Sequence, residues 1–136
     1  MSEAAPTPYR ASVDTIETAY EFLLAYAAQG RDREGEAGRS GIRGHLGAMR
    51  EGLSVIVDQA KAEASSLGGD TDPAFAAFLE VFAEDARIAR TKAELVLAAP
   101  VIGSQLVDNF NASVHVRALL TDLFLLDEFL KAVRRA

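Results

Sequence analysis

Apolar residues recur at three- and four-residue steps along most of the chain, a spacing that predicts amphipathic helices rather than strands. Between positions 42 and 64 the successive steps are 4, 3, 4, 3, 4 and 4, close to a heptad repeat. A helix with this repeat packs nearly parallel or antiparallel to its neighbour. The residues are Ile42, Leu46, Met49, Leu53, Ile56, Ala60 and Ala64.

Capping residues and glycines divide the pattern into four helices. Ser12 is the expected N-cap of the first helix and Gly30 its stop, while Asp72 followed by Pro73 marks the start of the third. The expected helical segments are 12–30, 40–66, 73–98 and 104–133. Because short connections make sequence neighbours antiparallel, the predicted fold class is all-α, an antiparallel up-down-up-down four-helix bundle.

Two segments lack this pattern. Residues 1–11 hold Pro6 and Pro8 among small and polar residues, which predicts a mobile N-terminal leader ahead of a single bundle domain over residues 12–136. Residues 30–41 are rich in glycine and in charges of both signs. A loop of this length is either functional or disordered, and the composition favours disorder.

The last segment, 104–133, has neither proline nor glycine, and eight large apolar residues crowd its C-terminal half. They cover most of the helix circumference, which indicates burial on more than one side. We expect one helix starting after Gly103. The alternative is a short helical piece over Val101–Val107 and a restart near Asn109 or Asn111.

The 136-residue chain has a net charge of −6 and a pI of about 4.9. This acidic balance argues against nucleic acid as the partner, because phosphate binding needs clustered Lys and Arg. The absence of cysteine excludes disulfides and thiolate metal sites, and it fits a cytoplasmic protein. The apolar run 95–102 is interrupted by Pro100 and is too short for a membrane span.

Histidine chemistry has no recognisable signature. A di-metal site in a helical bundle needs Glu three residues before an inward histidine, whereas Ile42 precedes His45 and Ala112 precedes His115. There is also no phosphate-binding glycine loop and no nucleophile motif. We therefore expect no metal, no cofactor and no catalytic residues, and the sequence leans towards a protein that is not an enzyme.

The best polar constellation lies on the last helix, where steps of 3, 4 and 7 place four residues on one face. If the helix is straight, this stripe continues its apolar face and lies opposite the alanine-rich end of the third helix. The hypothesis is a ligand pocket lined by Asp108, Asn111, His115 and Asp122. The alternatives are a satisfied core network or, if the helix bends near Asn111, a solvated face.

Leu120 and Phe124 fall among the polar residues of the same helix, so they form a candidate partner surface. Apolar residues there are typical of pairing across a two-fold axis. The sequence favours a non-catalytic, adaptor- or chaperone-like interaction or regulatory bundle that forms a homodimer through its C-terminal helix. An unidentified protein partner is compatible with this interpretation. The alternative is a small-molecule-binding protein or enzyme with a pocket near His115.

Overall fold

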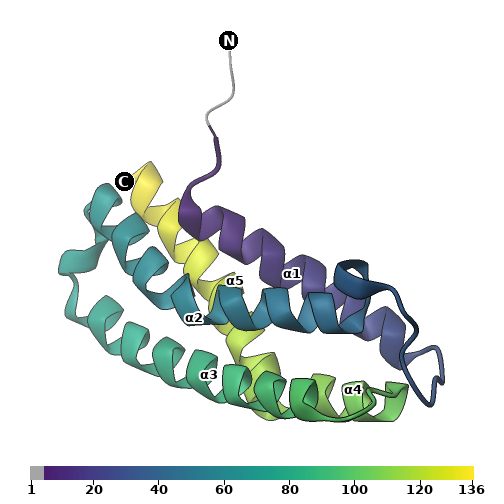
Figure 1. The fold of residues 1–136 in the computed structure, drawn as a ribbon. Coiled ribbons are helices and arrows are strands. Elements are labelled where there is room, and N and C mark those ends of the chain that lie inside the picture. Colours follow the sequence, from purple (N-terminus) through teal and green to yellow (C-terminus); the bar gives the residue numbers. More distant parts are fainter. Residues whose placement is uncertain (1–4) are drawn as a thin grey trace.

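The structure, a computed structural model, describes residues 5–136 except for the side chain of Arg39, and every regular element in that range is helical. The elements are α1 (Pro8–Ala27), α2 (Ile42–Leu67), α3 (Pro73–Ala98), α4 (Ser104–Asn111) and α5 (Val114–Arg135), with short 3-10 turns η1 (Gly38–Ser40) and η2 (Gly69–Thr71) (Figure 1). The all-α prediction is confirmed. The count of four is wrong, since five α-helices lie in this range. None of them has the length and apolar character that crossing a bilayer requires.

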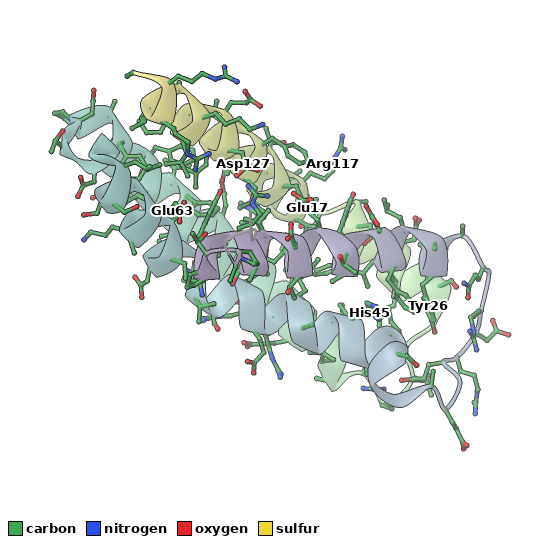
Figure 2. All side chains as sticks on the ribbon, turned by 90° about the horizontal axis from the view of Figure 1, so that it is seen from above. Glu17, Tyr26, His45, Glu63, Arg117 and Asp127 are labelled. Atoms are coloured by element: carbon green, nitrogen blue, oxygen red, sulfur yellow. The ribbon has the colours of Figure 1, made fainter. Side chains whose placement is uncertain are left out.

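Helices α1 and α2 lie alongside each other and run in opposite directions (Figures 1 and 2). Their crossing is close: a Cβ added to Gly52 of α2 would lie 2.9 Å from Cγ1 of Ile16 on α1. Nearer the other end of the pair, the rings of Phe22 and His45 stack with centroids 3.9 Å apart. The heptad-like spacing of α2 thus predicted its packing mode, and all seven seam residues are buried.

Helix α3 begins as predicted. The Asp72 side chain accepts a hydrogen bond of 2.8 Å from the Ala74 N–H. Pro73 occupies the first helical position, where a backbone N–H would have no partner within the helix, so its missing N–H costs nothing. Its alanine-rich end is not empty, because α4 lies alongside it and contributes the buried Val107 and Phe110 to the core (Figure 1).

The first helix begins earlier than Ser12. Thr7 is the N-cap, its Oγ1 accepts the Arg10 N–H at 3.2 Å, and Pro8 opens α1. Tyr9 is buried and donates a hydrogen bond of 2.7 Å to Asp127 of α5. This tertiary anchor moves residues 8–11 from the predicted leader into the helix, while residues 1–4 of that leader lie outside the described residues.

The predicted single C-terminal helix is wrong: it is two helices, separated at Ala112 and Ser113. The Asn111 side chain donates to the Leu23 carbonyl of α1 at 3.1 Å, and Lys92 of α3 donates to the Ser113 hydroxyl at 2.7 Å. These contacts hold α4 and α5 in different directions. The alternative prediction, in which the long helix restarts near Asn111, is closer to the observed structure.

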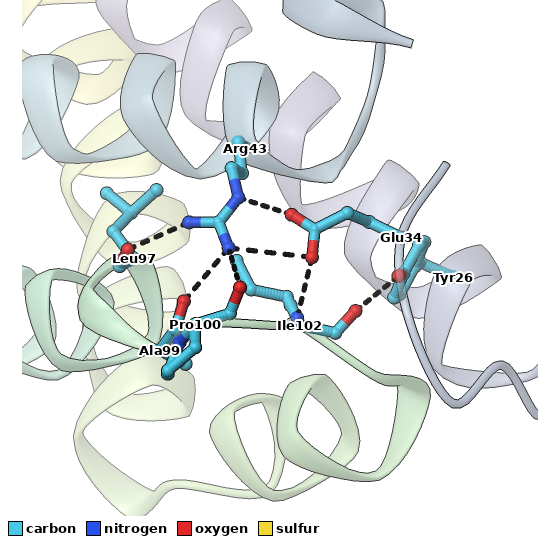
Figure 3. Close-up of polar contacts among 7 residues, drawn as sticks. All are labelled: Tyr26, Glu34, Arg43, Leu97, Ala99, Pro100 and Ile102. Carbon is cyan, nitrogen blue, oxygen red and sulfur yellow. Dashed lines mark hydrogen bonds and ion pairs between the residues drawn. The ribbon is translucent and has the colours of Figure 1, made fainter. Parts of the chain in front are cut away.

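The loop after α1 is tied to the turn between α3 and α4 (Figure 3). The Arg43 guanidinium donates to the carbonyls of Leu97, Ala99 and Pro100, which end α3, and it pairs with Glu34. Burial acts to raise the pKa of Glu34, but the Ile102 N–H and the Arg43 guanidinium outweigh it, so this pKa lies below its usual value. The expectation that this loop is disordered does not hold where it carries Glu34.

A second set of bonds completes this connection. Tyr26 donates to the Ile102 carbonyl at 2.5 Å, Ser104 donates to the Tyr26 carbonyl at 2.7 Å, and Arg31 and Ser104 exchange two bonds of 2.8 Å. We call the polar group that these side chains and backbone groups form the clasp; its residues are Tyr26, Arg31, Glu34, Arg43, Ile102 and Ser104. It satisfies backbone groups that a helix end would otherwise leave unpaired.

Candidate functional site

Helix α5 organises the most distinctive surface of the molecule. Its core face is buried, whereas Phe124 and Leu125 on its outer side have exposed fractions of 57% and 60%. Consecutive helical residues point about 100° apart. Phe124 therefore reaches towards α1 and Leu125 towards α3, and a depression lies on each side of the helix.

The depression between α1 and α5 has a volume of about 320 Å³, and we call it the α1/α5 hollow. Leu120 is buried in its floor, Tyr20 is half-buried beside it, and Phe124 stands at its rim. The predicted partner pair is thus divided: Leu120 belongs to the core and Phe124 to the surface. The lining residues are Glu17, Tyr20, Glu21, Arg117, Leu120, Thr121 and Phe124.

Charges of both signs border this hollow. Glu17 of α1 and Arg117 of α5 lie on the same face of the molecule, as Figure 2 shows. Burial raises the pKa of Glu17, and the nearby Asp127 carboxylate adds to the shift. Arg117 forms no ion pair within the described part of the chain, so its charge is available to another molecule.

The depression between α3 and α5 is smaller, about 220 Å³, and almost entirely apolar. We call it the α3/α5 groove. Phe75 and Phe129 stack in it with ring centroids 5.5 Å apart, and Leu125 forms part of its wall. The lining residues are Ala74, Phe75, Phe78, Leu125, Leu126 and Phe129.

Two aspartates, one on each helix, face each other beyond the groove. Asp122 of α5 lies within hydrogen-bonding reach of Asp85 of α3. Oδ2 of Asp122 is buried and finds no hydrogen-bond donor among residues 5–136. Burial raises the pKa of Asp122 to about 7, and the hydrogen bond and charge of Asp85 add to the shift. At neutral pH Asp122 is therefore protonated for part of the time.

The predicted polar stripe does not form one lining. Asp108 is exposed on α4, Asn111 is buried and bonded to Leu23, and His115 is 40% exposed with its Nδ1 3.6 Å from Asp85. Only His115 and Asp122 come together, and they do so around Asp85. The break at Ala112 separates the other two from them, because it rotates α4 away from the line of α5.

Asp85, Val81 and Leu125 were not singled out from the sequence. Asp85 occupies a position between Phe82 and Ala86, which are both buried, and that placement of a carboxylate beside a core face was the available signal. Leu125 lies within a run of apolar residues, so nothing in the sequence distinguished it from its buried neighbour Leu126.

The two depressions beside α5 combine exposed apolar side chains with charges of both signs. In residues 5–136 no group of three His, Asp or Glu side chains has the arrangement to hold a metal ion. The chain matches no protein-family model, no curated protein and no solved structure. The proposals below therefore rest on the two depressions beside α5 and on their charges.

Proposed function

We propose that this chain is a non-catalytic, adaptor-like interaction protein that forms a homodimer through α5, with the long helices arranged as an up-down bundle. The observation that supports the dimer is the α1/α5 hollow with Phe124 standing at its rim. A large exposed aromatic side chain beside a hollow of suitable size is a means of binding a second molecule. A cytoplasmic setting is part of the proposal, supported by the absence of cysteine.

A second copy is the occupant that the charges favour. In a two-fold interface the same patch meets itself, so it must carry both partners of every contact. This patch carries a protruding ring, a hollow and charges of both signs: Arg117 on α5, and Glu17 and Glu21 on α1. Across a two-fold axis, Phe124 of each copy fills the hollow of the other, and Arg117 faces the glutamates of its partner.

The test is native mass spectrometry and sedimentation of the full chain. We expect a dimer for the parent protein and a monomer for Phe124→Ser, because the substitution removes the apolar contact at the centre of the interface. Leu95→Ser is the matched control, since Leu95 is 72% exposed on α3, away from the hollow. It should leave the dimer intact.

Exchanging the charges of the proposed interface gives a second test of the dimer. Arg117→Glu should weaken the dimer by placing like charges together, and adding Glu17→Arg and Glu21→Arg should restore it. A parent protein that stays monomeric at roughly 100 µM, a concentration that would reveal Kd values of that order, would sink the proposal. An adduct of constant mass on that monomer would instead favour the small-molecule alternative.

A further inference from the structure

The α3/α5 groove is a second surface, on the other side of α5 from the α1/α5 hollow. Its floor is core: Phe75 and Leu126 have exposed fractions of 4% and 1%. Its wall is open at Leu125, which is 60% exposed. Val81 lies one turn along α3 from Phe78, outside the lining of the groove, and is 56% exposed. Within the described residues, the groove and Val81 therefore form an apolar strip that remains exposed.

This strip ends at the acid pair. The two helices are antiparallel, because Phe75 packs on Phe129, Asp85 faces Asp122 and Lys92 bonds to Ser113. Along α3, Asp85 follows Val81 by one turn, and along α5, Asp122 precedes Leu125 by one turn. Both carboxyl groups consequently lie at the same end of the groove, about 5 Å beyond its apolar wall at 1.5 Å per residue.

The acid pair lacks a full positive counter-charge from this chain. Within the described residues neither aspartate forms an ion pair with Lys or Arg, and the nearest basic atom is Nδ1 of His115, 3.6 Å from Asp85. Lys92, two turns further along α3 than Asp85, donates its hydrogen bond to Ser113. A cation supplied from outside would complete what His115 provides only in part.

We propose that the α3/α5 groove binds an amphipathic helix of another protein, with apolar side chains in the groove and a Lys or Arg against Asp85 and Asp122. The spacing in the molecule defines the partner's pattern. The apolar residues would recur at i and i+3 or i+4, because such residues share one helix face. The cation would follow three or four residues further along, over the acid pair.

The helix-binding surface is distinct from the dimer surface, so the two proposals can fail separately. The dimer depends on Phe124 and the charges of Glu17, Glu21 and Arg117. The helix site depends on Leu125 and the acid pair. A protein that is monomeric throughout could still bind the helix, and a dimer could form without binding it.

The test is selection from a phage-displayed library of helical peptides against the immobilised full chain. We expect enrichment of peptides that combine the apolar spacing with a Lys or Arg at the stated distance. The strongest peptide is then measured by fluorescence anisotropy beside a copy whose cation is replaced by Gln. The parent protein should bind the Gln copy about tenfold more weakly, which is about 1.4 kcal/mol.

Three variants identify the surface. Asp85→Asn with Asp122→Asn should reduce the difference between the two peptides to less than about twofold, because the carboxylates are gone while their shape is kept. Leu125→Ser should weaken both peptides. Leu95→Ser, the exposed position away from the groove, should change neither. Thermal melting followed by circular dichroism establishes that each variant is folded.

Several results would overturn this inference. They are no enrichment over the Leu125→Ser protein, enriched peptides without a cation, or an unchanged preference for the cation after both aspartates are replaced. Loss of the dimer in Leu125→Ser would also overturn it, since the groove would then be covered by a second copy of this chain.

Discussion

The clasp and the acid pair are both polar groups between helices, but they differ in how completely their charges are met. In the clasp, Glu34 is paired with Arg43 and accepts the Ile102 N–H, and Arg43 uses its remaining donors on the carbonyls that end α3 (Figure 3). In the acid pair, Asp122 faces another carboxyl group, and its Oδ2 receives no hydrogen bond from the described part of the chain.

This difference separates a structural group from a candidate binding group. A polar network whose members satisfy one another has little left to offer a ligand, and it stabilises one arrangement of the chain. A half-buried carboxyl pair without a full counter-charge among the described residues costs free energy in the isolated molecule. That cost falls when a partner supplies the missing cation, so the acid pair favours an added molecule and the clasp does not.

Among the polar groups, the clasp should show the largest effect. Arg43→Ala removes the donors that satisfy three carbonyls and leaves Glu34 without its cation, so we expect the free energy of unfolding to fall by about 2–3 kcal/mol. Urea denaturation followed by circular dichroism measures it. Arg33→Ala, at an exposed position of the loop that carries Glu34, is the control and should change little. Equal stability of the two variants would show that the clasp contributes nothing.

Gly103→Ala tests the same connection through the backbone. An added Cβ would lie 2.9 Å from the Asp32 carbonyl oxygen and 3.0 Å from that of Arg31, so the loop must move. We expect a loss of about 1–3 kcal/mol. Gly47→Ala is the opposite control, because its Cβ meets nothing within 4 Å. Gly47 lies in the interior of α2, so Gly47→Ala should raise the free energy of unfolding by about 0.5–1 kcal/mol. If Gly103→Ala were as stable as Gly47→Ala, the close approach of Gly103 to the Arg31 and Asp32 carbonyls would be contradicted.

The acid pair should show itself as a dependence of stability on pH. The pKa of Asp122 is raised from 3.8 to about 7, so the folded state holds this proton more tightly than the unfolded state. The stabilisation that the folded protein gains from holding this proton is complete below about pH 4, and it is lost as the pH rises through 7. Asp122→Asn should therefore match the parent at pH 4 and be more stable at pH 8, by about 1 kcal/mol after allowance for solvent screening.

Denaturation of both proteins across this pH range makes the measurement. Asp108→Asn is the control, because Asp108 is exposed on α4. Parallel pH curves for the parent and Asp122→Asn would mean that Asp122 ionises as an ordinary surface carboxylate.

The smallest effect is expected in the α3/α5 groove. Leu125 is 60% exposed, so Leu125→Ser should change the free energy of unfolding by no more than about 0.5 kcal/mol. Its neighbour Leu126 is 1% exposed, and Leu126→Ala should cost about 2–5 kcal/mol. Urea denaturation of the two variants measures both free energies of unfolding. A large loss of stability in Leu125→Ser would mean that Leu125 is a core residue and not part of the binding surface.

The helical architecture was predictable because its signals are local. The Asp72–Pro73 start of α3 needs only a side-chain acceptor and a residue without an N–H, and both are visible in the sequence. The seam of α2 follows from the spacing of its apolar residues. The start of α1 at Pro8 was less accessible, because it depends on Tyr9 reaching Asp127, 118 positions away.

The candidate surfaces were predicted only in part. The exposure of Phe124 followed from its place among polar residues, whereas Leu120, from the same pattern, is buried against α1. The prediction of one polar stripe required a single unbroken helix from Asp108 to Asp122. The break at Ala112 ended that phase, and it depends on contacts of Asn111 and Ser113 with two other helices.

The sequence by itself determined that this chain folds into helices, where most of them begin and end, and which face of each is apolar. These properties depend on residues within a few turns of one another. Only the tertiary structure decided that α4 and α5 are separate, that Arg43 and Glu34 join a loop to a distant turn, and that Asp85 meets Asp122. Each of these depends on residues far apart in the chain, whose side chains come within bonding distance only when the helices pack.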